Sequence, residues 1–288
     1  MNIEYLKTFI LLAENGSFSK TAKEMVVVQS TVSSRINELE REIGQKLFIR
    51  GKNYSELTMA GKALLEYAEK IVSLEAKAIA QANLAGDFSE RLVIGTVYSM
   101  YDTHICGYIQ GFMDKNPDIS IRVVFGHSKT IVSGIGRGII DVGYSYHPFN
   151  HPDYVCTLFD EDDIVFVTGS QNRKYISGIP VDKIKELPVY YSNFLYATTQ
   201  SWIFPKNKLF RLDVDIGTKI IPFLSRGENY TLLPRKAVEP EIKNGSLIEI
   251  PVLEGRIPPV QHYIIYRRES KKSAAVRKWL NSYEKDRF

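Results

Sequence analysis

The sequence predicts an α/β chain that begins with a small helical domain and continues into a larger domain of alternating strands and helices. Three observations lead to this fold class. Apolar residues recur at helical spacing up to about residue 84, and that region ends in a proline-free stretch from Met59 to Leu84. After Ala85-Gly86-Asp87, short apolar runs predict strands that alternate with helices, which is typical of an α/β sheet. The 288 residues are enough for about two domains of ordinary size.

Three helices open the chain in this prediction. The first begins near Ile3 and ends at Asn15-Gly16, since glycine favours the left-handed backbone at a helix end. The second is short and ends near Met25, and either Ser17 or Ser19 can cap it. A tight connection then leads to the third helix.

The third helix and the segment after it complete a compact motif. The helix is expected from about Ser30 to Ile43, and Gly44 ends it. Leu47–Ile49 and Ser55–Leu57 can pair as a short hairpin. Two short helices joined by a tight connection form a helix-turn-helix, and the hairpin would be its wing.

A long helix is expected next, from Met59 to about Leu84, with Thr58 as its cap. At 1.5 Å per residue it would be about 40 Å long. Apolar residues repeat seven apart along it, which favours pairing with the same helix of a second chain. Packing of this stripe on the helix's own domain is the alternative. The candidate dimerisation residues are Leu64, Tyr67, Ile71, Leu74 and Ala78.

The remaining residues are expected to form two α/β lobes with sheets rich in parallel strands. Strands are expected at Leu92–Val97, Ile119–Phe125, Ile140–Tyr144, Asp163–Thr168, Pro188–Tyr191, Leu212–Ile216, Tyr230–Leu233 and His262–Arg267. Helices are expected at His104–Lys115, at Lys129–Arg137 and around Val276, Leu280 and Tyr283. The predicted boundaries are residues 1–58 for the winged helix-turn-helix, 59–87 for the linker helix and hinge, and 88–288 for the two lobes. The first lobe takes about 88–161 and 266–288, and the second takes about 162–265.

Composition and charge exclude several classes of protein. The chain is 44% hydrophobic, which excludes a disordered chain, and no run approaches the ~18 apolar residues of a membrane span. Cys106 and Cys156 lack metal-site spacing, and Met1–Lys7 lacks the apolar core of a signal peptide, so a cytoplasmic protein is expected. Residues 1–91 hold 12 basic and 12 acidic side chains, so the excess charge of +4 lies elsewhere. Bulk charge therefore does not indicate nucleic-acid binding.

Local placement of side chains favours double-stranded DNA as a partner. Short donor and acceptor side chains on the outer face of the third helix suit base edges in a major groove. Basic side chains lie on the preceding helix and in the hairpin, where this motif meets phosphates. A solvated surface is the alternative for each charge taken alone, but their clustering around one helix face favours DNA contact. The candidates are Lys20, Lys23, Gln29, Ser30, Thr31, Ser33, Ser34, Arg35, Asn37, Arg50 and Lys52.

Residues 1–58 resemble the winged helix-turn-helix of LysR-type transcriptional regulators, and the rest of the chain resembles that family more weakly. The matching N-terminal residues are Leu6, Phe9, Gly16-Ser17-Phe18-Ser19, Ala22, Gln29, Val32-Ser33, Ile36, Leu39-Glu40, Gly44, Leu47-Phe48, Arg50, Leu57-Thr58 and Gly61. The later matches are Leu92–Gly95, Phe112, Asn116-Pro117, Ile119, Gly126-His127-Ser128, Gly138–Asp141, Gly227 and Leu232–Pro234.

The resemblance implies a DNA-binding domain, a linker-helix dimer and a two-lobed effector domain similar to periplasmic binding proteins. It also implies a homodimer that can form a homotetramer, a pseudo-palindromic DNA site, and a small molecule in the cleft that alters DNA bending or contact with RNA polymerase. Simple capping by Ser128 and a turn at Ser192-Asn193 are the alternatives to effector contact. The candidate effector-binding residues are Ser99, Met100, Ser128, Asn193 and Arg226.

Two positions depart from the family pattern in the third helix. Val28 stands where the family usually has serine, which removes an N-cap worth about 0.5–2 kcal/mol unless Ser30 substitutes for it. Ser34 stands where arginine is common, and Arg35 follows one place later, about 100° around the helix. Arg35 is therefore expected to meet phosphate rather than a base.

Enzyme signatures are not found. The sequence has no P-loop, GxSxG or HExxH motif, and Gly134–Gly138 lacks the spacing of a dinucleotide loop. His147 and His151 fall in a proline-containing loop, and Asp160–Asp163 is expected to be a solvated turn rather than a cation site. No catalytic residue, metal site or cofactor is therefore expected. The alternative to a DNA-binding regulator is a cytoplasmic solute-binding or small-molecule-processing protein with a helical dimerisation arm.

Overall fold

The computed structural model describes residues 1–51, 54–82, 88–195, 203–205, 208–225 and 227–285, with the backbone but not the side chains of residues 50, 81, 284 and 285. It divides into two compact units. One unit comprises Met1–Arg91 with Gly136–Ile139, and the other comprises Leu92–Ile135 with Ile140–Phe288. No helix among the described residues is long and apolar enough to cross a lipid bilayer.

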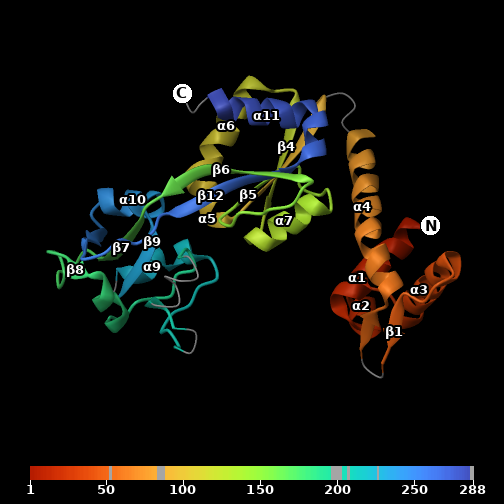
Figure 1. Cartoon of the computed structure of the whole chain (residues 1–288), viewed down its shortest axis with the longest axis horizontal. Coiled ribbons are helices and arrows are strands. Elements are labelled where there is room, and N and C mark those ends of the chain that lie inside the picture. Colours follow the sequence, from red (N-terminus) through yellow and green to blue (C-terminus); the bar gives the residue numbers. More distant parts are fainter. Residues whose placement is uncertain (52–53, 83–87, 196–202, 206–207, 226, 286–288) are drawn as a thin grey trace. The chain divides into compact units, whose positions relative to one another are not determined.

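The N-terminal unit is a winged helix-turn-helix followed by a long helix (Figure 1). Asn2 caps the first helix, Ser17 caps the second, and Thr58 Oγ1 accepts a hydrogen bond from Gly61 N in the first turn of the long helix. Gly16 and Gly44 end the first and third helices in the left-handed region, at φ 62° and 74°. The elements are α1 (Ile3–Asn15), α2 (Phe18–Glu24), α3 (Gln29–Ile43), β1 (Phe48–Arg50), β2 (Ser55–Leu57) and α4 (Met59–Ala82).

The core of this unit joins α1, α3, the wing and α4. Its side chains come from one face of each helix, at spacings of three and four residues. The polar faces of the helices are left to solvent. The buried apolar residues are Leu6, Phe9, Leu12, Ile36, Leu39, Leu47, Phe48 and Ala68.

A buried carboxylate fixes the wing to α3. Glu40 is 4% exposed, and its Oε1 accepts hydrogen bonds from Leu47 N at 2.9 Å and Phe48 N at 3.3 Å. The Lys46 ammonium donates to Oε2 at 2.7 Å. Burial alone would raise the pKa of Glu40, but the hydrogen bonds from Lys46, Leu47 and Phe48 outweigh it and lower the pKa. The wing strand β1 therefore starts from a fixed point on α3.

The wing is also joined closely to α4. Leu47 O accepts from Thr58 N at 2.9 Å, and Thr58 Oγ1 donates to Lys46 O at 2.7 Å. A Cβ atom at Gly61 would lie 2.2 Å from Leu47 O, so only glycine lets the helix approach the wing this closely.

The helix α4 has two apolar faces rather than the single seam expected. Leu64 and Ile71 pack against the core of their own unit, as the alternative prediction had it, because they lie on the same face as buried Ala68. Tyr67 and Leu74 are 63% and 68% exposed, and Ala78 is exposed as well.

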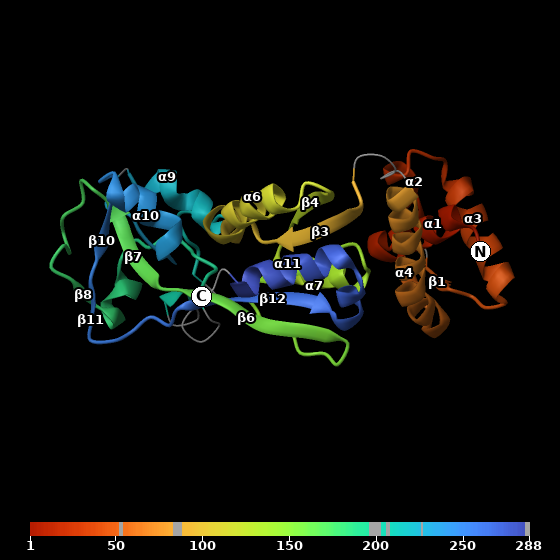
Figure 2. The same ribbon diagram turned by 90° about the horizontal axis from the view of Figure 1, so that it is seen from above.

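The second unit contains two sheets. The first sheet is covered on one face by α6 and α11, which lie side by side in Figure 2, and on the other face by α7. Leu92 and Ile94 of β3 face the first layer and Val93 faces the second, which is the alternation of a strand buried on both faces. Its strands lie in the order β4 (Ile119–Phe125), β3 (Glu90–Thr96), β5 (Val142–Ser145), β12 (Val260–Arg267) and β6 (Tyr154–Asp162). Its helices are α5 (Tyr98–Met100), η1 (Tyr101–Ile105, a π-helical turn), α6 (Cys106–Lys115), α7 (Ser128–Gly136), η4 (Arg268–Lys272) and α11 (Ala274–Lys285).

The second sheet is antiparallel and has its own core around Phe166, Tyr230 and Leu232. Its order is β10 (Leu247–Ile250), β7 (Ile164–Gly169) and β9 (Tyr230–Pro234). Around it lie η2 (Val181–Glu186), η3 (Gly217–Ile220), α9 (Ile221–Leu224), α10 (Arg235–Lys243) and the short parallel pair β8 (Ile179–Pro180) and β11 (Val252–Leu253).

The chain passes between the two sheets along a pair of strands. After β6 ends at Asp162, only Asp163 separates it from β7 of the second sheet. The chain returns as β12, which pairs antiparallel with β6 from Val260↔Asp162 to Arg267↔Tyr154, with an irregularity between His262 and Tyr263. Residues 260–265, which the sequence assigned to the second lobe, therefore lie in the first sheet.

Several sequence expectations need correction. Parallel pairing joins β3 to β5, but the second sheet is antiparallel, so the prediction of parallel-rich sheets is wrong there. Leu212–Ile216 is not a strand, and Pro188–Tyr191 contributes an isolated bridge from Val189 to Tyr230. The expected solvated turn at Asp160–Asp163 is also wrong, because Asp160 and Asp162 end strand β6 and Asp162 is buried.

The role of Glu40 can be tested by Glu40→Gln. The substitution removes the charge that holds Leu47 N, Phe48 N and Lys46, and we expect the N-terminal unit to lose about 1–3 kcal/mol of unfolding free energy at neutral pH. Since the pKa of Glu40 is lowered by folding, its contribution is present above its unfolded pKa and is lost as the pH falls through the folded value. Hydrogen exchange at the Leu47 and Phe48 amides, measured against pH, follows this loss.

The control is Glu38→Gln, because Glu38 is partly exposed and its carboxylate bonds to Arg41 on the same helix. This control is expected to cost less than about 0.5 kcal/mol. Equal losses in the two variants would contradict the anchoring role of Glu40.

Candidate functional site

The outer face of α3 is polar and accessible. Gln29, Ser30, Ser34 and Asn37 are exposed, while Thr31 and Ser33 are partly buried at the edge of this face. Val32, Ile36 and Leu39 point the other way into the core, which fixes the rotation of the helix. The structure thus brings the short polar candidates together on one surface.

The turn before α3 has an unusual backbone. Val26 adopts φ 55°, in the left-handed region, and its side chain is 90% exposed. Val27 N donates to Ala22 O, which closes the turn over α2. Val28 precedes the first residue of α3 and no side-chain hydrogen bond caps the helix there, so Ser30 does not substitute for the serine usual in this position.

Arg35 is held within its own unit. Its Nη1 donates to Thr8 Oγ1 at 3.1 Å and lies 3.9 Å from Glu4 Oε2. The expected phosphate contact would require this guanidinium to leave Thr8 or to use its remaining N–H groups. We therefore treat Arg35 as a residue that joins α3 to α1.

The structure describes the side chains of the two basic candidates on α2 but not those of the two in the wing. Lys20 and Lys23 lie exposed on α2. Arg50 ends strand β1, and its side chain is outside the described part of the chain, as is Lys52 altogether.

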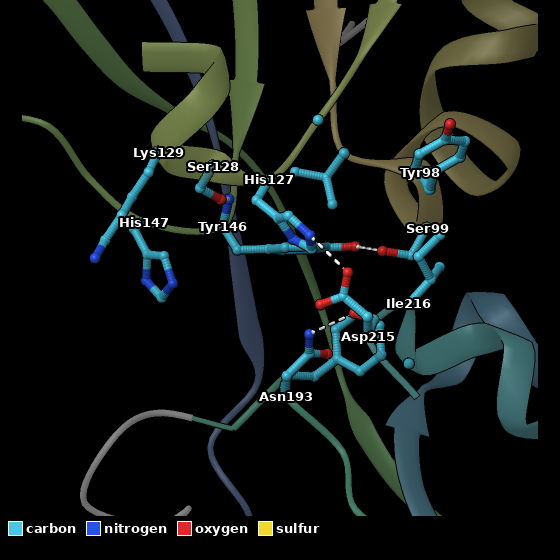
Figure 3. Close-up of a pocket in the computed structure, with 14 residues that line it drawn as sticks. Tyr98, Ser99, His127, Ser128, Lys129, Tyr146, His147, Asn193, Asp215 and Ile216 are labelled. Atoms are coloured by element: carbon cyan, nitrogen blue, oxygen red, sulfur yellow. Dashed lines mark hydrogen bonds and ion pairs between the residues drawn. The ribbon is translucent and has the colours of Figure 1, made fainter. Parts of the chain in front are cut away.

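A cleft lies between the two sheets of the second unit, with a cavity of about 310 Å³ (Figure 3). One wall comes from the ends of β3, β4 and β5 and from the start of α7, and the other comes from residues around Asn193 and Asp215. This is the position where ligands meet open α/β sheets, at strand ends and helix starts. The lining residues are Val97, Tyr98, Ser99, Gly126, His127, Ser128, Lys129, Tyr146, His147, Asn193, Phe194, Asp215, Ile216 and Gly217.

Hydrogen bonds shape the wall of the cleft that is formed by the strand ends and the start of α7. Ser99 Oγ and Tyr146 OH lie 2.7 Å apart, and Ser128 Oγ accepts from Tyr146 N at 3.3 Å. Burial raises the pKa of Tyr146, so its phenol remains protonated at neutral pH. Ser128 is therefore bound to the backbone of β5's end as well as facing the cleft.

One contact joins the walls across the opening: His127 Nε2 lies 3.0 Å from Asp215 Oδ2 (Figure 3). Within the second wall, Asn193 Nδ2 donates to Asp215 O at 3.1 Å. His127 and Asp215 are both more than half exposed, so their contact can open without burying a charge.

The effector candidates divide into three groups. Ser99, Ser128 and Asn193 line the cleft. Met100 does not: its side chain is fully buried in the core beneath α5, because the helical turn rotates it away from Ser99. Arg226 lies outside the described residues. Asp215 was missed because Leu212–Ile216 looked like a strand, whereas its chain is irregular and reaches the cleft.

Comparisons with known proteins agree with this architecture. A family model described as "Bacterial regulatory helix-turn-helix protein, lysR family" matches residues 3–62, and one described as "LysR substrate binding domain" matches residues 85–286. The chain belongs to the LysR family of transcriptional regulators. The family consists of regulators rather than enzymes, so the alternative of a small-molecule-processing protein is set aside.

Relatives of this LysR-family chain match nearly its whole length. The HTH-type transcriptional regulator YusT of Bacillus subtilis (strain 168) is 26% identical over 282 residues, covering 96% of this chain and 94% of YusT. The HTH-type transcriptional regulator CitR of the same organism is 25% identical and covers 98% of this chain and 99% of CitR.

Solved structures show the same fold at low identity. The crystal structure of CbnR, a LysR family transcriptional regulator, has a TM-score of 0.67 at 19% identity and covers 99% of both chains. Full-length CbnR in complex with its target DNA has a TM-score of 0.66 at 20% identity, also covering 99% of both chains.

Proposed function

We propose that this LysR-family regulator binds a two-fold related site in double-stranded DNA and changes its DNA contacts when a small molecule binds between its lobes. The observation on which this depends most is the polar outer face of α3. That face is exposed, while the opposite face is buried and Glu40 fixes the adjoining wing. A helix held in this way can enter a major groove without reorganising its own domain.

The α3 face offers side chains for two kinds of contact. Gln29, Ser33 and Asn37 lie four residues apart, one turn after another, and we assign them to base edges together with Ser30, Thr31 and Ser34. Lys20 and Lys23 on α2 are assigned to phosphates, with Arg50 and Lys52 of the wing. Arg35 is assigned to the α1–α3 contact, with a phosphate as its second partner.

We propose that α4 pairs with the α4 helix of a second copy through its exposed apolar face. Tyr67 and Leu74 are 63% and 68% exposed on a helix of 24 residues, and exposed Ala78 lies on the same side, because at ~100° per residue the three fall within about 40° of one another. Side chains of this size are expected to be covered by a partner when they form a continuous stripe. A dimer places two α3 helices on one DNA duplex, and a dimer of dimers would place four, which doubles the number of DNA half-sites bound.

The cleft is proposed as the effector site. Its volume of about 310 Å³ is at the lower end of the range for small-molecule pockets, so a small metabolite suits it. Ser99, Ser128, Lys129 and Asn193 supply hydrogen-bond donors, and Tyr98 supplies an aromatic wall. We propose that the protein acts in the cytoplasm and that effector binding alters DNA bending or contact with RNA polymerase.

The DNA-binding assignment is tested on the full-length chain with a duplex selected from a random pool. Gln29→Ala and Ser33→Ala are expected to cost about 1–3 kcal/mol at one or two base positions and to relax the preference there. Lys23→Ala is the control: it should weaken binding to all sequences alike and reduce the slope of log affinity against log salt by about one. An unchanged preference in both α3 variants would remove this face from DNA contact.

The pairing of α4 is tested by Leu74→Asp. Since Leu74 is exposed within one chain, the substitution should leave the folded chain intact, whereas a charge inside a helix pair would separate the two copies. Sedimentation equilibrium should give a monomer, and affinity for a two-fold DNA site should fall by about 100-fold or more through loss of the linked second domain. Ala76→Asp adds the same single charge at an exposed position of α4, about 200° around the helix from Leu74, and is the matched control. A dimer that persists in Leu74→Asp would rule out this interface.

A further inference from the structure

A cluster of titratable side chains lies outside the cleft, where the chain passes between the two sheets. Within the described part of the chain, His104, Asp160 and His262 place one possible metal-ligand atom each within 4.8 Å of the others. His104 comes from the π-helical turn η1, Asp160 from β6 and His262 from β12. Asp160 and His262 are direct partners across the β6–β12 pairing, so the sheet itself holds two of the three groups.

His262 is buried, and the described residues offer its ring no hydrogen bond. The residue is 1% exposed, and neither Nδ1 nor Nε2 has a partner in that part of the chain. Its ring meets the His104 ring edge to face, with centroids 4.3 Å apart. Buried polar atoms are almost always hydrogen-bonded, so this imidazole points to a ligand that the lone pair of one of its nitrogens can bind, such as a metal ion.

Both imidazoles are held in the neutral form that binds metals. Burial, with the charge of Lys236, lowers the pKa of His104 to about 4. Burial, with the charge of His104, lowers the pKa of His262 to about 3. At neutral pH each ring is therefore uncharged and has a lone pair on one nitrogen, and Asp160 is an ionised carboxylate.

The side-chain ammonium of Lys236 lies at the edge of this cluster. Lys236 Nζ lies 3.2 Å from His104 Nε2 and also donates to Asp160 Oδ2. Lys236 is the second residue of helix α10 in the second lobe, and its backbone N donates to Asp162 Oδ2 at 3.1 Å. The ammonium is partly exposed, as is Asp160, so solvent reaches the cluster from this side.

We propose that His104, Asp160 and His262 form a binding site for a zinc-like divalent transition-metal ion. Two imidazole nitrogens and one carboxylate oxygen are a donor set that Zn²⁺ accepts, with water in the fourth position. The ligand atoms need small side-chain movements to reach the ~2.0–2.2 Å bonds of such a site. The ion takes the place of the Lys236 ammonium, which turns outward to solvent.

The position of the site links metal binding to the arrangement of the lobes. The three ligands belong to the first sheet and its helix layer, whereas Lys236 belongs to the second lobe. An ion that displaces Lys236 breaks a contact between the lobes beside the two crossing strands. Metal binding should therefore favour a different lobe arrangement from that of the metal-free chain.

The test uses the full-length chain, freed of metal with a chelator that is then removed. Titration with Co²⁺, followed by its visible absorption, should show one saturable four-coordinate site per chain, and Zn²⁺ should displace the Co²⁺. His262→Leu should abolish this site, and because leucine is of similar size and leaves no polar atom buried, the fold should remain intact by circular dichroism. His151→Ala removes a histidine beside Asp153 at the surface and should bind like the parent.

Two further variants, Lys236→Met and Asp160→Asn, test the site by a change in metal affinity, so that loss of binding through misfolding can be told apart from loss of a ligand. Without the competing ammonium, Lys236→Met should bind Co²⁺ about tenfold more tightly, and Asp160→Asn should bind at least tenfold more weakly. The proposal is overturned if neither the parent chain nor Lys236→Met shows saturable binding. It is equally overturned if binding survives His262→Leu and is lost instead in His127→Ala, which would place the ion in the cleft.

Discussion

The antiparallel pairing of β6 with β12 is the constraint on which the second unit depends. These strands lie at one edge of the first sheet, and through them the chain enters and leaves the second sheet. The pairing holds the walls of the cleft in one unit, and its register sets Asp160 opposite His262. Because the two strands are connected to the second lobe at adjacent ends, the lobes can shift about them while the pairing remains intact.

The N-terminal unit was largely predictable from the sequence because its signals are local. Glycines at 16 and 44, the cap at Thr58 and the helical spacing of Val32, Ile36 and Leu39 each act within a few residues. The resemblance to LysR-type regulators was shown by the family matches. The strand Ile119–Phe125 was predicted with the bounds that the structure has, since both of its ends are marked by turn residues.

Other features depend on contacts between distant residues and could not be predicted in the same way. The acidic end of β6 looks like a turn in the sequence, but it is a strand paired with β12. The buried carboxylate there, of Asp162, accepts a hydrogen bond from the backbone N–H of Lys236. The seven-residue repeat of α4 did not show which residues the chain's own core would cover, and that core takes Leu64 and Ile71. Met100 was predicted to contact the effector together with Ser99. The two residues are adjacent in a helical turn, so their side chains point in different directions: Ser99 lines the cleft and Met100 is buried in the core.

Recognition of a specific DNA site by the α3 face of this LysR-family chain can be measured by footprinting. The full-length protein is placed on DNA from upstream of its own gene, over a series of salt concentrations and with excess random duplex. We expect protection with two-fold symmetry and an affinity for that site well above the affinity for random duplex, with both affinities falling steeply as salt rises. Binding no tighter than to random duplex at every salt concentration, with and without cell metabolites added, would contradict it.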